Sequence, residues 1–96
     1  MKIFIKEREN GGFAIARDNE KRAGAMTYSS AGEHLIIIDH TEVAPEYMGK
    51  KVGLQMLYKI VEMARENEMK IIPLCPFAEA MFKKEENIRD VLKNNN

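Results

Sequence analysis

The sequence predicts an α+β domain with a mostly antiparallel five-stranded sheet, a main helix after the fourth strand and a short C-terminal helix after the fifth. Two observations lead to this class. Four strand-like runs separated by short polar turns come first, and a long segment with helical spacing of apolar residues then precedes one more strand-like run. A chain of 96 residues has the size of one domain, so we expect residues 1–96 to form a single unit whose ligand site is a cleft.

The first half of the chain predicts an antiparallel meander of four strands. Apolar and charged residues alternate in the first two runs, and an asparagine and two glycines lie between them, which is typical of a hairpin. The fourth run is rich in β-branched residues and is the strongest strand signal of the four. The strands are expected at residues 2–6, 13–17, 23–29 and 35–43.

The second half predicts two helices with a fifth strand between them. Leu54, Leu57, Val61 and Ala64 recur at steps of three and four residues, which indicates one buried face of a helix ending near Glu68. The remaining elements are expected at residues 70–75 (strand), 77–83 (short helix) and 87–92 (a last helical turn), and the tail at 94–96 should fray.

The most informative segment is residues 44–53, which joins the fourth strand to the main helix. Gly49 and Gly53 leave the backbone N–H groups accessible, and Lys50 and Lys51 lie where a helix start usually carries acidic residues. The first N–H groups of a helix have no partner within the helix and attract anions. We therefore expect a phosphate cradle here, although the segment alone is equally compatible with a loop that turns a solvated corner.

Composition limits the possible partners. Fifteen basic residues balance fifteen acidic ones without a long run of either sign, so we expect neither nucleic acid nor a membrane surface as the partner. No apolar run approaches the roughly 20 residues of a membrane span, and Met1–Lys6 is too short for a signal peptide, which predicts a cytoplasmic protein. One cysteine and two histidines are too few for an internal disulfide or for a four-ligand zinc site, so we expect no metal.

Three separated motifs, in this order of elements, resemble the GNAT superfamily of acetyl-CoA-dependent N-acetyltransferases. They are His40-Thr41 near the end of the fourth strand, Pro45 in the loop and Cys75–Phe77 after the fifth strand. The chain is especially similar to the small single-domain branch of the superfamily, and the likeness covers essentially its whole length. The resemblance implies a GNAT-like fold in which acetyl-CoA, the cosubstrate, binds where the fourth and fifth strands splay apart.

The resemblance also implies which residues contact coenzyme A. The superfamily loop has Gln or Arg, two free positions, Gly, one free position, and Gly or Ala, and its amides hold the pyrophosphate. With Gly53 on the last position, Met48 and Lys51 depart from the pattern, because Met48 lacks a polar group and Lys51 replaces a glycine. Lys83 and its neighbour Lys84 are expected at the 3′-phosphate, or simply on a polar helix face. The expected contacts are Val43, Met48, Gly49, Lys50, Lys51, Val52, Gly53, Leu54, Phe77 and Lys83.

Cys75 is the first candidate catalytic residue. Pro76 suits the first position of a helix, which places Cys75 at the helix cap, where the helix dipole favours a thiolate. The thiol can carry the acetyl group as a thioester or protonate the departing thiolate of coenzyme A. The alternative is that Cys75 packs as a small hydrophobic residue, as free cysteines usually do.

His40 is the second candidate catalytic residue. Strand periodicity predicts that it shares a face with Ile36 and Ile38, and if that face meets the cleft, His40 can act as a base or activate Cys75. The alternative is a half-buried histidine hydrogen-bonded to the backbone.

Three functions remain open at this level. The first is an N-acetyltransferase that transfers acetyl from acetyl-CoA to an unidentified amine, with direct transfer and an acetyl-Cys75 intermediate both open. The second is an acyl-CoA-binding or protein-interaction module with little or no catalysis, which the departures at Met48 and Lys51 favour. The third is a small domain without a ligand that pairs its edge strands into a dimer. We expect a monomer or a weak dimer.

Overall fold

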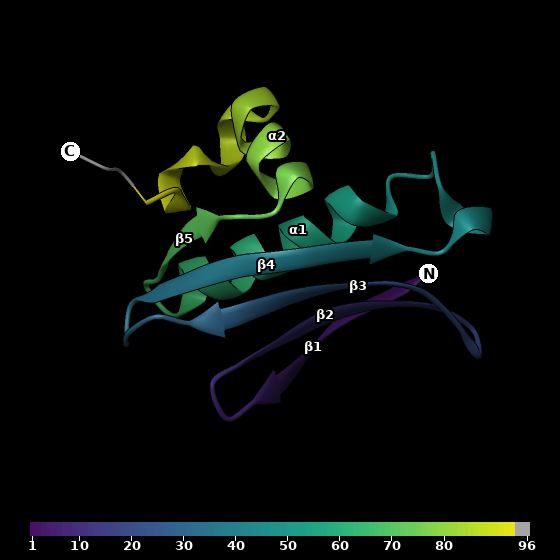
Figure 1. Cartoon of the computed structure of the whole chain (residues 1–96), viewed down its shortest axis with the longest axis horizontal. Helices are drawn as coiled ribbons and strands as arrows, with labels where there is room; N and C mark the ends of the chain where they lie inside the picture. Colours follow the sequence, from purple (N-terminus) through teal and green to yellow (C-terminus); the bar gives the residue numbers. More distant parts are fainter. Residues whose placement is uncertain (94–96) are drawn as a thin grey trace.

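The computed structural model describes residues 1–93, so the predicted fraying of residues 94–96 lies outside the described part of the chain. Figure 1 shows a curved sheet with the helices gathered on one side of it. In chain order the elements are β1 (Lys2–Arg8), β2 (Gly11–Asp18), β3 (Lys21–Ser30), β4 (Leu35–Val43), the 3-10 turn η1 (Pro45–Tyr47), α1 (Val52–Glu66), β5 (Lys70–Pro73), α2 (Pro76–Lys84) and the 3-10 segment η2 (Glu86–Val91).

The strands form one five-stranded sheet in the order β1-β2-β3-β4-β5. The four strands β1 to β4 pair antiparallel as a meander, and β5 pairs parallel to β4 after the crossover through α1. The predicted α+β class and the mostly antiparallel sheet are therefore confirmed. Within residues 1–93, no helix is long and apolar enough to cross a membrane.

Only β4 has the predicted bounds; β1 and β2 are longer than predicted, and β3 and β5 differ as well. β3 is longer than expected, because a tight turn joins it to β2. β5 ends at Pro73 instead of Cys75, since the N–H groups of Leu74 and Cys75 both donate to the carbonyl oxygen of Ile38, at 3.0 and 3.2 Å. The chain turns away from β4 at this point, and among residues 1–93 the second half of β4 has no strand partner on its β5 side.

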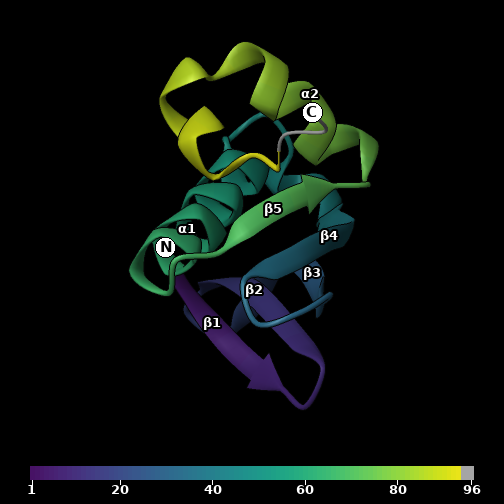
Figure 2. The ribbon, with the colours of Figure 1, turned by 90° about the vertical axis from the view of Figure 1, so that its left-hand side faces the viewer.

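The core lies between α1 and one face of the sheet. Figure 2 shows α1 against this surface and α2 beyond the β5 edge, with no helix on the opposite surface. We call the surface under α1 the helix face and the opposite surface the open face. The helix residues that are buried share one side of α1, as the spacing of apolar residues predicted. They are Val52, Gly53, Met56, Leu57, Ile60, Val61 and Ala64.

β4 contains a β-bulge at Asp39. Thr27 of β3 pairs with His40, whereas the next residue, Tyr28, pairs with Ile38, so Asp39 has no partner of its own. Side chains alternate between the two faces of a strand, and one extra residue moves every later side chain to the other face.

The prediction that His40 shares a face with Ile36 and Ile38 is wrong because of this bulge. Ile36 and Ile38 are buried under α1, whereas the side chain of His40 is 68% exposed on the open face. Thr41, which pairs with the buried Met26, lies on the helix face instead.

The C-terminal segment packs against α1 and β5. Arg65 of α1 donates to both carboxylate oxygens of Asp90, at 2.9 and 2.8 Å, and to the carbonyl oxygen of Asn87. The guanidinium lowers the pKa of the Asp90 carboxyl below its ordinary value. The N–H of Lys93 donates to the carbonyl of Ile71 at 2.9 Å, which extends the sheet by a short parallel bridge. The predicted last helical turn is thus the 3-10 segment η2.

Candidate functional site

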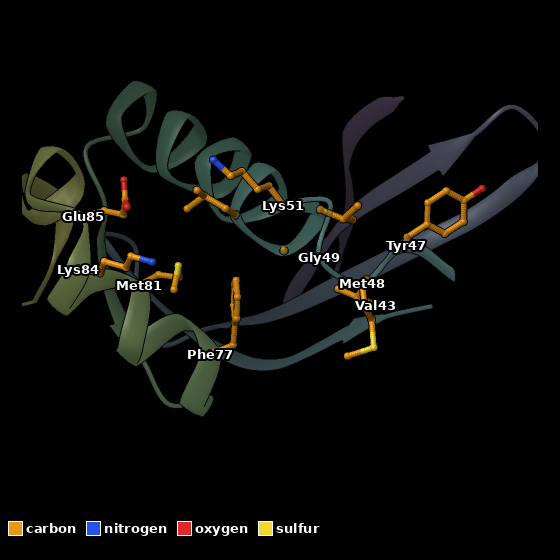
Figure 3. A pocket seen from close by; sticks show the side chains of 12 residues that line it. Val43, Tyr47, Met48, Gly49, Lys51, Phe77, Met81, Lys84 and Glu85 are labelled. Atoms are coloured by element: carbon orange, nitrogen blue, oxygen red, sulfur yellow. The ribbon is translucent and has the colours of Figure 1, made fainter. Parts of the chain in front are cut away.

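A groove of about 500 Å³ lies between the N-terminus of α1 and the side of α2, with the loop after β4 at its other end (Figure 3). Eight of the ten residues predicted to contact a coenzyme line this groove: Val43, Met48, Gly49, Lys51, Val52, Gly53, Leu54 and Phe77. The glycine- and lysine-rich segment before α1 and Phe77, more than twenty positions later, thus line one concave surface.

Two predicted residues do not line the groove. Lys50 extends toward Tyr47, with its amine 6.0 Å from the ring centroid. Lys83 lies on the outer side of α2 at 3.5 Å from Glu79. The groove is lined instead by the neighbouring Lys84, because consecutive helical residues point about 100° apart.

Four further residues line the groove: Tyr47, Met81, Lys84 and Glu85. Sequence reasoning missed Met81 and Glu85, whereas it considered Lys84 for the 3′-phosphate and Tyr47 as a weaker candidate acid for the leaving group. Met81 lies four residues after Phe77, on the same side of α2, which is a spacing that the sequence does show. Glu85 accepts a hydrogen bond from the hydroxyl of Tyr58 on α1 at 2.7 Å, and this bond raises the pKa of the tyrosine. The end of the groove near Lys84 therefore carries both charge signs.

The N-terminus of α1 lacks a cap. The first hydrogen bond of the helix runs from the N–H of Gln55 to the carbonyl of Lys51 at 3.0 Å. Lys51, the N-cap residue, makes no side-chain hydrogen bond to the helix, and no acidic residue lies in the first turn. The N–H groups of Val52, Gly53 and Leu54 have no partner within residues 1–93, and all three residues line the groove. These N–H groups form a positively polarised floor suited to an anion.

Two residues of the loop before α1 adopt left-handed backbone conformations, Gly49 with φ of 80° and Lys51 with φ of 62°. Glycine takes such angles without strain, whereas a lysine does so at a cost of roughly 1–2 kcal/mol. Lys51 stands where the family pattern has a glycine, and here it holds a left-handed conformation of the kind that glycine adopts readily while adding a cation. Lys50 and Lys51 precede α1, and its first turn begins at Val52.

Gly53 is required by the close approach of Phe77. A β-carbon at position 53 would lie 2.6 Å from the Cζ atom of the Phe77 ring, inside any real contact distance. Figure 3 shows the ring standing in the groove and pointing at the start of α1. Gly53 therefore brings the aromatic wall of the groove directly over the uncapped helix end.

The free edge of β4 continues the groove toward the sheet. The N–H of Ala44 donates to the carbonyl oxygen of Ala23 in β3. Backbone groups point alternately to the two sides along a strand, so those of every second residue before Ala44 also point to β3. The backbone groups of Thr41 and Val43 point the other way, to the edge that β5 has left. An amide-bearing ligand that lies along this edge can form hydrogen bonds with them as an added strand does.

Cys75 is the N-cap residue of α2, and Pro76 occupies the first position of that helix, as predicted. Its sulfur accepts a hydrogen bond from the N–H of Ala78 at 3.4 Å and lies 3.2 Å from the hydroxyl of Thr41. Cys75 is 5% exposed and is not among the residues that line the groove. The thiol thus lies under the wall of the groove, at the point where β4 and β5 separate.

His40 does not reach this thiol. Its ring is exposed on the open face, where Nε2 lies 3.8 Å from a carboxylate oxygen of Glu42. The hydroxyl partner of Cys75 is Thr41, which the bulge at Asp39 turns toward the groove side. Among the described residues, the arrangement therefore brings together a thiol and a hydroxyl in place of the predicted thiol and imidazole.

The loop between β4 and α1 is attached to the β2–β3 turn, a link that the sequence did not reveal. The hydroxyl of Tyr47 donates to Asp18 at 2.7 Å, and this bond raises the pKa of Tyr47. Lys21 forms an ion pair with Glu46. These two contacts join η1 to a turn that is far away in the sequence, and they hold the loop that carries Gly49.

Comparisons with known proteins agree with this architecture. The chain matches the profile of the GCN5-related N-acetyl-transferases over residues 12–91. A GCN5-like protein from Staphylococcus aureus is 38% identical and superposes with a TM-score of 0.71, covering 97% of this chain and 90% of that one. A search of curated proteins returns no significant match.

Two more distant structures share the fold alone. Nourseothricin acetyltransferase is 22% identical, with a TM-score of 0.61, and the match spans 79% of this chain and 49% of that chain. The GCN5 protein of Tetrahymena is 11% identical, with a TM-score of 0.67 over 93% of this chain and 64% of that chain. The GNAT-like fold implied by the sequence motifs is confirmed. Because the profile match covers most of its length, the chain belongs to the GCN5-related N-acetyltransferase family.

Proposed function

We propose that this protein binds acetyl-CoA in the groove between α1 and α2 and transfers the acetyl group to an amine. The observation that carries the proposal is the uncapped start of α1, where the N–H groups of Val52, Gly53 and Leu54 face the groove without a partner among residues 1–93. Three convergent N–H groups at a helix N-terminus bind a pyrophosphate well. Lys51 adds a positive charge beside them.

The rest of the coenzyme follows from this anchor. The pantetheine arm would lie along the free edge of β4, where its amides meet the backbone groups of Thr41 and Val43. Phe77 and Met48 supply apolar walls, and Lys84 lies toward the adenosine end of the groove. This orientation directs the thioester toward the gap between β4 and β5, where Cys75 lies.

Two mechanisms fit this geometry. In direct transfer, the nitrogen of a neutral amine attacks the thioester carbonyl and the C–S bond breaks. The departing thiolate of coenzyme A takes a proton from the thiol of Cys75. Solvent then removes the extra proton from the amide nitrogen and returns a proton to Cys75. In the two-step route, Cys75 gives up its proton and its thiolate attacks the thioester carbonyl; the C–S bond to coenzyme A breaks and the departing thiolate takes up a proton from solvent. The amine then attacks the acetyl-cysteine, the Cys75 thiolate leaves, and it regains a proton as the amide nitrogen loses its extra one. Thr41, at 3.2 Å from the sulfur, can orient the thiol in either route.

A binding module with little catalysis is the second candidate. Two observations favour it. Cys75 is almost fully buried under the wall of the groove, and the imidazole of His40 points away from it on the open face. This candidate retains the coenzyme site and lacks an exposed base or nucleophile at the thioester.

The test is an amide NMR titration with acetyl-CoA, followed at residues 49–54 and at Cys75. We expect saturable shifts at Val52, Gly53 and Leu54, and much smaller ones with acetyl-pantetheine, which lacks the pyrophosphate. Absence of shifts up to millimolar acetyl-CoA would remove both the transferase and the binding module. Release of the coenzyme A thiol with an amine panel then separates these two, since the module predicts binding without release.

A further inference from the structure

The open face of the sheet has a chemical pattern that the coenzyme site does not use. Directly paired residues of neighbouring strands point to the same face, so the register determines which side chains lie there. Lys2 pairs with Arg17, which pairs with Arg22, and Lys6 pairs with Phe13. Both rows lie on the open face, away from α1, and Figure 2 shows no helix over them.

Five exposed basic residues occupy the β1–β3 part of this face: Lys2, Lys6, Arg8, Arg17 and Arg22. None of them forms an ion pair with a carboxylate within residues 1–93, whereas Lys21 and Arg65 elsewhere pair with Glu46 and Asp90. The three strands place no acidic side chain on the open face. A chain that is neutral overall thus presents a concentrated positive surface here.

An apolar strip runs between the basic residues. Phe4, Ile15 and Ala25 lie side by side across β1, β2 and β3, and Phe13 lies in the next row. Ile15 and Ala25 are buried, whereas the two phenylalanines are half-buried, and no helix of the described part of the chain covers them. The guanidinium of Arg8 lies 4.9 Å from the ring centroid of Phe13 and covers part of that ring.

The far rim of the same face is acidic. Glu42 of β4 lies beside Ala25, and His40 lies beside Thr27. The bulge residue Asp39, also exposed, accepts a hydrogen bond from Ser29. This rim borders the edge where β5 leaves β4, which is the edge that receives the thioester in the proposed function. Three strand spacings separate the rim from β1, a distance of about 14 Å.

We infer that the acetyl acceptor is an acidic polypeptide segment that lies across the open face, with its amine at the rim of Asp39 and Glu42 and its carboxylates on the basic residues of β1 and β2. This inference rests on the proposed function. An extended chain rises about 3.4 Å per residue, so the 14 Å span corresponds to about four residues between the acceptor amine and the acidic group. The apolar strip receives side chains from the intervening residues.

Single-stranded nucleic acid and a second copy of the chain suit this face less well. Asp39 and Glu42 repel phosphates along the rim, and Arg8 occupies a ring that a base would need for stacking. A second copy that paired its β1 edge with this one around the same central residue would place Lys2 against Arg8, which are like charges. An acidic peptide with one free amine meets both signs of charge in the observed order.

The experiment uses the peptide acetyl-Gly-Lys-Gly-Leu-Gly-Glu-Glu-Glu-amide as the probe. A matched peptide with three glutamines in place of the glutamates and a fifteen-nucleotide oligothymidine serve as comparisons. Amide NMR titrations of the full chain follow Phe4, Lys6, Phe13 and Thr27. We expect the acidic peptide to shift these amides, to bind at least about tenfold more tightly than the glutamine peptide, and to weaken with added salt.

The double variant Lys6→Glu with Arg17→Glu should weaken binding of the acidic peptide at least about tenfold. The control variant, Lys59→Glu with Lys93→Glu, changes the net charge equally on other surfaces and should leave it unchanged. For acetylation of the lysine in the acidic peptide, we expect KM to rise in the Lys6→Glu, Arg17→Glu variant and to stay unchanged in the control variant. The inference is overturned by equal loss in both variants, by tighter binding of the oligothymidine, or by concentration-dependent shifts of these amides without peptide, which would indicate a second copy.

The coenzyme site is followed separately in the same samples. If acetyl-CoA shifts residues 49–54 and the acidic peptide shifts nothing, the inference fails while the proposed function stands. If acetyl-CoA shifts nothing and the peptide still binds the open face, the proposed function fails, and with it the assignment of the peptide as an acetyl acceptor.

Discussion

Two helix N-termini border the same groove, and only one of them is capped. At α2, the N-cap residue Cys75 accepts a hydrogen bond from the helix, Pro76 occupies the first position and Glu79 lies in the first turn. At α1, the N-cap residue Lys51 is left-handed, caps nothing, and no acid follows it. Both helices pack against the same sheet, so packing stability alone does not explain the difference.

Under the proposed function, the comparison indicates where the helix start forgoes a stabilising cap in favour of ligand binding. A helix start ordinarily satisfies its orphan N–H groups with a side chain, which contributes about 1 kcal/mol. α2 follows this rule and its first turn is closed to anions. α1 leaves three N–H groups to an external partner and adds a left-handed lysine, two local costs that a bound pyrophosphate would offset.

The largest effect is expected from a substitution that fills the space at the uncapped N-terminus of α1. Gly53→Val places a side chain into the Phe77 ring, so it should destabilise the fold by about 1–3 kcal/mol and abolish the acetyl-CoA shifts at residues 49–54. Thermal unfolding and the NMR titration measure the two effects. The double variant with Phe77→Ala should regain most of the stability; if Gly53→Val alone binds acetyl-CoA normally, the groove does not hold the coenzyme.

A change of charge at the α1 cap is expected to act next most strongly. Lys51→Glu removes a cation from the groove and places an acid at the helix N-terminus, where it complements the dipole. Acetyl-CoA affinity should therefore fall by about tenfold while the melting temperature stays equal or rises slightly. Lys59→Glu, on the exposed side of α1, is the control. Parallel losses of affinity in both variants would mean that Lys51 acts only through the net charge of the protein.

The capped N-terminus of α2 gives a smaller effect that separates chemistry from structure. Cys75→Ala removes the acceptor for the Ala78 N–H and should destabilise the fold by about 1 kcal/mol, whereas Cys75→Ser restores a strong cap. If the thiol takes part in transfer, both variants lose turnover although only Cys75→Ala loses stability. Full turnover in the serine variant would restrict Cys75 to a structural role.

The smallest effect concerns the contacts that hold the loop before α1. The ion pair with Lys21 lowers the pKa of Glu46 below its ordinary value of 4.5, so its stabilisation is present above that pH and is lost as the pH falls through the lowered folded-state value. The melting temperatures of the wild type and Lys21→Ala should differ slightly at pH 7 and converge at pH 2. Both groups are solvent-exposed, so the difference should also shrink in 1 M salt. A constant difference at all pH values would show that Lys21 acts through packing.

The charge pattern of the open face could not be read from composition. Equal numbers of acidic and basic residues led us to expect neither nucleic acid nor a membrane surface as the partner, but they do not determine where the charges lie on the folded chain. Alternation along β1 places Lys2, Lys6 and Arg8 on one face, and β2 adds Arg17 beside Lys2. The number of charged residues is a property of the sequence, whereas the gathering of basic residues on one face arises when the strands pair in register.

The sequence by itself determined the features that depend on near neighbours. Apolar spacing predicted α1, alternation predicted the meander, the glycines around Lys51 predicted accessible N–H groups at the start of α1, and Pro76 predicted that Cys75 caps α2. Each of these depends on conformational preferences within a few residues.

Only the tertiary structure decided which side chains meet across the site. The bulge at Asp39 turns His40 to solvent and Thr41 to the thiol of Cys75, and the fold attaches Tyr47 to Asp18. A bulge exists only in the pairing of two strands, and one extra residue reverses every later position because side chains alternate with a period of two. Which side chain lies beside the thiol of Cys75 thus depended on a register that no single strand contains.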